Sequence, residues 1–417
     1  MPEGPVSRAL AALLLSSAAV VIALLLVELG LTLVDFPPAP TESQRLFVEY
    51  DSVRGWRNVR GGHARMVTPE FTVKLDYNDR SYRGPLHDYR REPGRPRVLL
   101  LGDSYLEGYT VALKDRVAEV AESLLQKTPP SRGTADIIAL GTGGYSTDQE
   151  LLWLESEGLR YTPDLVVLLF VDNDYWYNAR ERYPRGEKPL FRVSGDSLVL
   201  SNVPVPRPPP DSTRTEPNPG PGTRTKRFLS RHLHLYRLLK LGIRRSPKLQ
   251  SLGARLGLIE APETVSTGGG SIAAPAEFSI FANPLPPSAD SAVTVTAKLL
   301  TRMAREVRSS GAAFRVIHVP SNAAIYPPGA PQSATFQRQA PFNAPERSGQ
   351  LFIRTCRLAA VPCLEPTPAF VTAAESLAVR KQLLVFPQDG HWNEHGHRLA
   401  GKILANLIRV TLDSLER

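Results

Sequence analysis

The sequence is short of cysteine and of long apolar runs, and both shortages narrow its interpretation. Its 417 residues include only two cysteines, Cys356 and Cys363, and no histidine stands close to them in the sequence. A zinc site built on this pair is therefore a poor interpretation. Outside the cytoplasm the pair would be oxidised to a disulfide, and two buried thiols are the alternative. Apart from one N-terminal stretch, nothing is apolar for long enough to cross a membrane.

Acidic residues are missing from one long segment of the chain. No aspartate or glutamate occurs from Pro217 to Ile259, where ten lysines and arginines fall. This segment accounts for the net charge of +9. Apolar residues recur in it at helical spacing, which predicts a basic amphipathic helix over residues 226–248. Such a helix would contact anionic lipid head groups or an acidic polymer, or it would pack on the domain with a solvated basic face.

The N-terminal apolar stretch is the clearest signal of location. It runs without a charge from Ala9 to Val27, about the length that spans a bilayer as a helix. Arg8 precedes it and Glu28 follows it, so the positive-inside tendency leaves the N-terminus in the cytoplasm and the rest outside, in the periplasm or at the cell surface. A cleaved signal peptide is the alternative, although no clean cleavage site follows the run. An extracytoplasmic location argues against nucleic acid as a partner of the basic segment.

Apolar runs that alternate with helical patterns predict an α/β fold. Hydrophobic residues make up 42% of the chain, enough for a packed core. Continuous apolar runs followed by helical patterns imply a parallel sheet covered on both faces. The predicted strands are residues 98–104, 135–141, 164–174, 313–321 and 361–366. The predicted helices are residues 117–127, 147–158, 291–311, 351–360 and 397–415.

The same patterns divide the chain into five regions. Residues 1–35 are an N-terminal transmembrane anchor, and residues 36–95 are a linker and a small β-rich extension. Residues 96–178 and 291–417 form the two parts of one α/β domain. Residues 179–290 interrupt it as a Pro-rich and basic helical insertion. Within this insertion, residues 201–225 are predicted to be disordered and residues 264–276 to be flexible.

The strongest local motif is Gly102-Asp103-Ser104, which ends the first predicted strand of the domain. A serine at the carboxyl end of a parallel strand lies where α/β sheets place their sites. The alternative is a strand-ending turn in which the serine caps a helix.

Three later motifs also follow predicted strands or precede the last helix. The glycine-rich turn from Gly141 to Gly144 would let backbone N–H groups approach a ligand closely, and the amide of Asn173 could donate to an oxyanion. Asp389 stands two residues before His391, a spacing that lets a carboxylate orient an imidazole as a general base. Each motif taken singly could be an ordinary turn.

Other histidines compete as the base. His395 and His397 lie at the start of the last predicted helix and lack this arrangement, and His318 ends a strand, where a core or rim histidine is expected.

The four motifs, in this order, resemble the four blocks of the SGNH (GDSL) hydrolase superfamily. The resemblance covers residues 96–178 and 291–415 and implies a flavodoxin-like three-layer α/β/α sandwich with a mostly parallel sheet. It also implies that Ser104 is a nucleophile in a catalytic triad with Asp389 and His391.

The resemblance further implies an oxyanion hole made by the backbone N–H groups of Ser104 and Gly144 and the side chain of Asn173, with Gly141 as the alternative glycine. Two departures stand out. The last pair is Asp-x-His rather than the commoner Asp-x-x-His, which resembles the polysaccharide O-acetyltransferase branch, and Ala139 stands where many relatives have asparagine.

The expected reaction is acyl transfer through a serine ester, with no metal or organic cofactor. The expected substrate is an O-acyl ester of an envelope carbohydrate or lipid. An O-acetyltransferase for an exported polysaccharide is the alternative, and a non-catalytic envelope-binding protein on the same fold is a further one.

Overall fold

The structure is a computed structural model. It describes residues 5–34, 36, 47–68, 70–131, 133–195, 197–208, 221–245, 264–267, 270–273, 285–327, 329–330 and 346–415. The chain divides into two compact units, one within residues 1–42 and 210–262 and the other within residues 43–209 and 263–417. They are described separately below as the N-terminal unit and the α/β unit.

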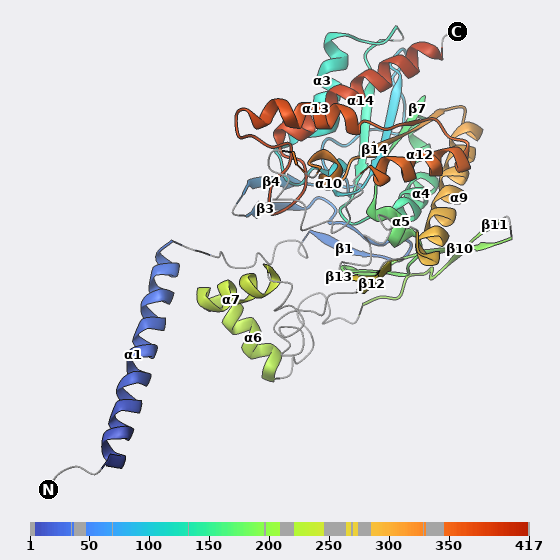
Figure 1. Cartoon of the computed structure of the whole chain (residues 1–417). Coiled ribbons are helices and arrows are strands. Elements are labelled where there is room, and N and C mark those ends of the chain that lie inside the picture. Colours follow the sequence, from blue (N-terminus) through green and yellow to red (C-terminus); the bar gives the residue numbers. More distant parts are fainter. Residues whose placement is uncertain are drawn as a thin grey trace. The chain divides into compact units, whose positions relative to one another are not determined.

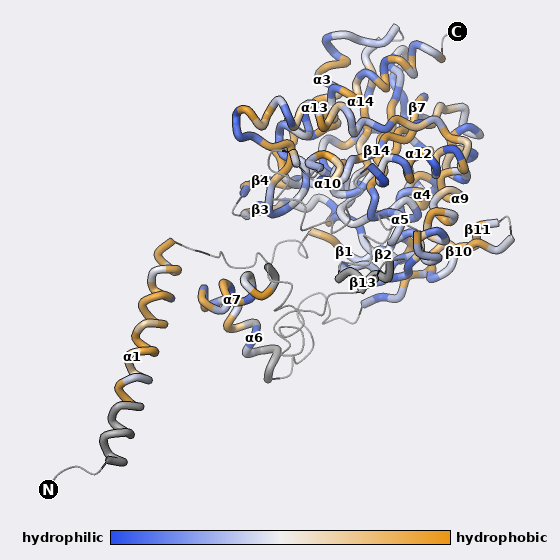
Figure 2. Tube along the Cα trace, in the orientation of Figure 1, coloured by the Kyte–Doolittle hydropathy of each residue, from blue (hydrophilic) through white to orange (hydrophobic). Residues whose placement is uncertain are grey.

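The N-terminal unit consists of one long apolar helix and two short helices. The helices are α1 (Pro5–Leu33), α6 (Pro221–His232) and α7 (His234–Arg245). Residues Leu14–Leu33 of α1 are long and apolar enough to cross a membrane, and the described part of α1 is mostly hydrophobic in Figure 2. By length and composition this helix is either a membrane anchor or a signal sequence.

The prediction of one continuous basic helix over residues 226–248 is wrong, because the helix breaks at Leu233. Residues 246–248 lie outside the described part. The carboxylate of Glu28 explains the break. It accepts hydrogen bonds from the backbone N–H groups of His234 at 2.8 Å and Leu235 at 2.7 Å, which are donors that the first turn of a new helix leaves unpaired. A side chain 206 residues away therefore caps α7.

A five-stranded parallel sheet forms the centre of the α/β unit (Figure 1). Its strands are β5 (Arg97–Gly102), β6 (Asp136–Gly141), β7 (Leu165–Val171), β14 (Ala313–Val319) and β15 (Cys363–Leu364). They lie in the order β6-β5-β7-β14-β15, which is the flavodoxin-like order 2-1-3-4-5. The predicted fold class is thereby confirmed.

Helices cover both faces of this sheet, as the continuous apolar strands require. Alternate strand residues such as Leu99 and Leu101 pack with α4, α9 and α12, while Val98 and Leu100 pack with α3, α13 and α14 on the opposite face. The helices of the unit are α2 (Ser104–Glu107), α3 (Val117–Lys127), α4 (Thr147–Ser156), α5 (Asn173–Asn178), α9 (Pro287–Ser309), α10 (Asn322–Ile325), α12 (Arg347–Ala359), α13 (Thr367–Ala378) and α14 (Glu394–Ser414). Short 3-10 turns span Leu113–Asp115 and Gly158–Tyr161.

Two hairpins precede the sheet, as the turn-rich pattern before residue 95 predicts. They are β1 (Val48–Asp51) with β2 (Gly55–Asn58), and β3 (His63–Val67) with β4 (Thr72–Asp76). The second hairpin buries Met66, Val73 and Leu75 in a small core that also contains Tyr109. This extension therefore packs against the segment that follows Ser104.

The region predicted as a helical insertion is partly β-structure. It contains the hairpins β8 (Arg182–Tyr183) with β9 (Gly186–Glu187), β10 (Leu190–Ser194) with β11 (Ser197–Ser201), and β12 (Thr264–Thr267) with β13 (Gly270–Ala273). The prediction that residues 264–276 are flexible is wrong for the described residues, because they form this last hairpin. The prediction of disorder for residues 201–225 is wrong where the structure describes them, because Ser201 ends β11, Val205 is buried and residues 221–225 begin α6. Residues 209–220 lie outside the described part. The domain boundaries stay predictions.

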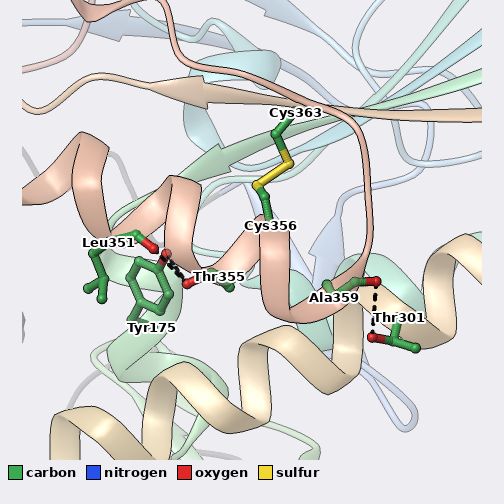
Figure 3. The surroundings of a disulfide bond; sticks show 7 residues. All are labelled: Tyr175, Thr301, Leu351, Thr355, Cys356, Ala359 and Cys363. Atoms are coloured by element: carbon green, nitrogen blue, oxygen red, sulfur yellow. Dashed lines mark hydrogen bonds between the residues drawn. A yellow bond between two sulfur atoms is a disulfide. The ribbon is translucent and has the colours of Figure 1, made fainter.

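Cys356 and Cys363 form a disulfide between α12 and β15 (Figure 3). The prediction of a disulfide is therefore correct, and the alternative of two buried thiols is wrong. Helix α13, which follows β15, was not predicted. Only Phe370 and Ala374 of this helix are buried, so its apolar stripe is too thin to stand out in the sequence.

Candidate active site

Ser104 stands at the carboxyl end of β5, the first strand of the sheet in chain order, where the sheet order changes direction. The chain turns sharply there into α2, and Asp103 caps that helix by accepting a hydrogen bond from the backbone N–H of Tyr105 at 2.9 Å. A Cβ on Gly102 would lie 2.9 Å from the Cβ of Leu106, so the turn needs glycine at this position. Ser104 remains partly exposed while its neighbours in β5 are buried. The strand therefore presents one hydroxyl at the switch point of the sheet.

His391 and Asp389 reach this hydroxyl from the turn before α14. The Oγ of Ser104 lies 2.8 Å from Nε2 of His391, and Nδ1 of the same ring lies 2.8 Å from Oδ1 of Asp389. Gly390 between them has a φ of +89°, which a residue with a side chain rarely adopts. The structure thus brings together three predicted residues from opposite ends of the α/β unit.

Two side chains that the sequence did not single out hold this turn. The carboxylate of Glu70, between β3 and β4, accepts the backbone N–H of Gln388 at 3.0 Å and that of Asp389 at 2.8 Å. The Nδ2 of Asn322 donates to the carbonyl oxygen of Gly390 at 2.8 Å. The turn therefore depends on the β-rich extension as well as on α10.

Two tyrosines next to Ser104 were also missed. The hydroxyl of Tyr109 donates to Oδ2 of Asp389 at 3.0 Å and lies 2.9 Å from Nδ1 of His391. The ring of Tyr105 lies 4.7 Å from the imidazole, centroid to centroid. Their place one and five residues after Ser104 was the signal in the sequence. Tyr109 thus restrains the carboxylate–imidazole pair from the side opposite Ser104.

Electrostatics favour a basic imidazole at this position. Burial lowers the pKa of His391, but the hydrogen bond and charge of Asp389 outweigh burial and raise it above 6.5. Burial raises the pKa of Asp389, and the bond to His391 more than reverses this, so that the carboxylate stays ionised. Burial raises the pKa of the neighbouring Asp103 to about 6. An ionised Asp389 on one ring nitrogen leaves the other free to accept the proton of Ser104.

The predicted oxyanion donors lie at the ends of the strands that flank β5. Gly144 follows β6 with a φ of +78°, and Asn173 opens α5 directly after β7. Within the described residues, the N–H groups of Ser104 and Gly144 and the amide of Asn173 donate no hydrogen bond, and Oδ1 of Asn173 is buried without a partner. These donors are free to bind a ligand.

Buried Glu107 connects the turn at Ser104 to the glycine turn. Its Oε2 accepts the backbone N–H of Gly143 at 2.6 Å, and it also accepts the hydroxyl of Tyr77. A Cβ on Gly141 would lie 2.4 Å from the backbone nitrogen of Glu107, so the two turns pack backbone to backbone. Glu107 therefore fixes the glycine turn beside the helix that Ser104 begins.

The competing histidines have other partners. Nδ1 of buried His397 accepts the N–H of Val117 at 3.3 Å, and burial, with Arg83 and Arg116 nearby, lowers its pKa to about 3. His318 is buried, as expected of a core histidine, and both of its ring nitrogens face carboxylates. Among the residues described, no group of three or more histidine, cysteine, aspartate or glutamate side chains could hold a metal ion.

Comparison with known proteins finds similarity to solved structures alone. No family model matches the chain, and no curated protein matches it. The lipase/acylhydrolase from Enterococcus faecalis is 11% identical, with a TM-score of 0.38 over 76% of this chain and 96% of that chain. The acetyl xylan esterase AlAXEase is 10% identical, with a TM-score of 0.37 over 75% of this chain and 99% of that chain.

A catalytic mutant of an acetylxylan esterase from Geobacillus stearothermophilus is 10% identical, with a TM-score of 0.35 over 76% of this chain and 94% of that chain. These scores are too low to support an argument about activity, and the fold class rests on the sheet order above. The solved structures that this chain resembles include a lipase/acylhydrolase and acetyl xylan esterases.

Proposed function

We propose that the chain is a serine-dependent ester hydrolase of the SGNH type. One observation carries the proposal, namely the continuous row from the Ser104 hydroxyl through the His391 imidazole to the Asp389 carboxylate. A hydroxyl, a base and a group that orients the base are the parts that nucleophilic acyl transfer needs. The same row supports the catalytic roles expected of these residues.

In the proposed reaction, His391 takes the proton of Ser104 while Oγ attacks the carbonyl carbon of an ester. The N–H groups of Ser104 and Gly144 and the amide of Asn173 hold the oxyanion, and one such donor is worth about 3 kcal/mol of barrier. The alcohol leaves with the proton from His391. Water, deprotonated by the same ring, then attacks the acyl-serine and releases the acid.

The proposed location and substrate follow from α1. If this helix is an uncleaved anchor, the α/β unit works outside the cytoplasm at the membrane surface. O-acyl esters on envelope carbohydrates or lipids are the substrates available there. The basic helices α6 and α7 are proposed to contact anionic head groups, since Glu28 near the end of α1 caps α7.

Transfer to an acceptor is the second candidate, and the short Asp389-x-His391 spacing is the observation that favours it. A sugar hydroxyl would replace water in the second half of the reaction. Product analysis with and without a carbohydrate acceptor separates the two, because only a transferase yields an acylated acceptor in place of free acid.

A fluorophosphonate probe tests the nucleophile directly. The full chain in detergent should be labelled, Ser104→Ala should lose the label, and Ser348→Ala, which changes a buried serine of the same unit, should keep it. An unlabelled wild-type protein, or an equally labelled Ser104→Ala variant, would overturn the proposal and favour a non-catalytic binding protein.

A further inference from the structure

The β8–β9 hairpin lies against the glycine turn of the site. A Cβ on Gly144 would lie 2.6 Å from Cε1 of Tyr183, so the tyrosine ring rests on this glycine. Tyr183 is itself fixed between aromatic rings, with centroids 5.5 Å from Trp56 and 4.4 Å from Tyr177. Pro184 and Arg185 form the tip between the paired residues Tyr183 and Gly186. The hairpin is therefore held by packing and carries its tip close to the site.

The tip brings one guanidinium group next to the nucleophile turn. Nη2 of Arg185 and Oε2 of Glu107 each lie 2.9 Å from the point that a Cβ on Gly143 would occupy. Glu107 is the last residue of the helical turn that Ser104 begins, and this turn closes with a hydrogen bond from Gly108 N–H to the carbonyl of Ser104. Arg185 thus lies beside the glycine turn, at the position where the side chain of Glu107, one helical turn after Ser104, also reaches it.

Arg185 has no anionic partner of its own in the described part of the chain. It is half-buried, forms no hydrogen bond there, and has no carboxylate oxygen within 4.0 Å of its guanidinium. Glu107, the nearest candidate, is already bonded to Gly143 and Tyr77. Arg182 on the same hairpin differs, because it forms an ion pair with Glu187.

An arginine that is half withdrawn from water without a carboxylate is a ready binding group for an anion. Its planar donors match the two oxygens of a carboxylate or phosphate. The neighbouring residues Tyr183, Pro184 and Gly186 carry no carboxylate that could compete for the Arg185 guanidinium. The fixed hairpin also limits how far the side chain must be ordered when an anion binds.

We infer that Arg185 selects esters that carry a carboxylate or phosphate group close to the scissile bond. The inference rests on the proposed esterase function and narrows its substrate class to anionic esters. An acidic glycan and a phosphate-bearing lipid or polymer share this chemistry, and the substrates of the test separate them.

Three acetyl esters of similar size test the inference: an O-acetyl hexose, an O-acetyl uronic acid and an O-acetyl sugar phosphate. The full chain should hydrolyse one of the two anionic esters with the highest kcat/KM. Arg185→Gln should lower that kcat/KM by about ten- to a hundredfold, mainly through KM, and should leave the neutral ester within about twofold. Arg185→Lys should recover part of the loss, and Arg182→Gln, the matched control, should change neither value.

Equal loss on the neutral and anionic esters, or a wild-type protein without preference for either anion, would overturn the inference while leaving the esterase intact. A wild-type protein that hydrolyses none of the three esters would instead overturn the proposed function, and the inference with it.

Discussion

Two groupings of serine, histidine and aspartate use the carboxyl ends of the strands: Ser104, His391 and Asp389, called here the open grouping, and Ser348, His318 and Asp172, called here the closed grouping. They contain the same three residue types within one unit. Their imidazoles differ in exposure, since 25% of the His391 side chain is exposed and 0% of the His318 side chain. The comparison shows what distinguishes an imidazole that can accept a proton from one that holds segments of the fold together.

The difference lies in what occupies the second ring nitrogen. In the open grouping one nitrogen faces a carboxylate and the other faces the hydroxyl of Ser104. In the closed grouping, Nε2 of His318 lies 3.0 Å from Asp172 and Nδ1 lies 3.2 Å from Glu365. Ser348 donates to Asp172 at 2.5 Å, and its oxygen lies 3.3 Å from Nε2 of His318. A ring held by two carboxylates has no free site for a proton.

The charge of His318 follows from this arrangement. Burial lowers its pKa, but Asp172 and Glu365 outweigh burial and raise it to about 9. His318 is therefore a cation at neutral pH that ties together the ends of β7 and β14, the start of α12 and the segment after β15. The Cys356–Cys363 disulfide joins α12 to β15 beside the same tie.

The sharpest test replaces each of the two serines by alanine in turn. Ser104→Ala should lower kcat for ester hydrolysis by about 10⁴-fold or more, because the nucleophile is lost. Ser348→Ala should keep kcat/KM within about threefold, because its hydroxyl contacts only Asp172 and His318 of the closed grouping. Steady-state hydrolysis of one ester by both variants measures the contrast, and similar losses in the two variants would remove the distinction between the groupings.

Asp389→Asn should lower kcat by roughly 10³- to 10⁴-fold, since the ring loses its orienting carboxylate. The pH dependence of kcat/KM provides a second measurement. His391 must be neutral to act as a base, so kcat/KM should fall as the pH drops through its pKa, which lies above 6.5 in the wild-type protein. Without Asp389 that pKa falls, and the acidic limb should move to lower pH. An unmoved limb would show that another group titrates.

His318→Gln should destabilise the fold by about 3 kcal/mol, because buried Asp172 and half-buried Glu365 lose the cation between their carboxylates. The folded-state pKa of His318 is raised from 6.5 to about 9, so its contribution is full below pH 6.5 and is lost as the pH rises through 9. The difference in unfolding free energy between wild type and variant should therefore shrink over that range. Denaturant unfolding at pH 6 and pH 9.5 measures it, with His395→Gln as the control; a constant difference would mean that His318 is neutral.

Tyr109→Phe should lower kcat by about tenfold with little change in KM or melting temperature, because one charge-assisted hydrogen bond to Asp389 is lost. Tyr105→Phe is the matched control, since its hydroxyl makes only a 3.4 Å contact with the carbonyl of Gly390. Equal effects in the two variants would argue that Tyr109 acts through packing alone.

Much of the fold could be read from the sequence because its signals are local. The helix predicted over residues 117–127 is observed with the same bounds, and each predicted strand of the sheet is present within a few residues of its expected ends. The predictions of secondary structure fail where a distant group alters a helix or where few apolar residues mark an element. The break at Leu233 needed the carboxylate of Glu28, and α13 buries too few residues to be recognised.

The sequence by itself determined the order of strands and helices, the four motifs and the residues Ser104, Asp389 and His391, because apolar periodicity and short spacings are properties of neighbouring residues. Only the tertiary structure decided that Glu70 and Tyr109 hold the Asp389 turn and that Arg185 faces the glycine turn. Tyr109 and Asp389 are 280 residues apart, and the path of the chain through the sheet sets such contacts, which no local pattern encodes.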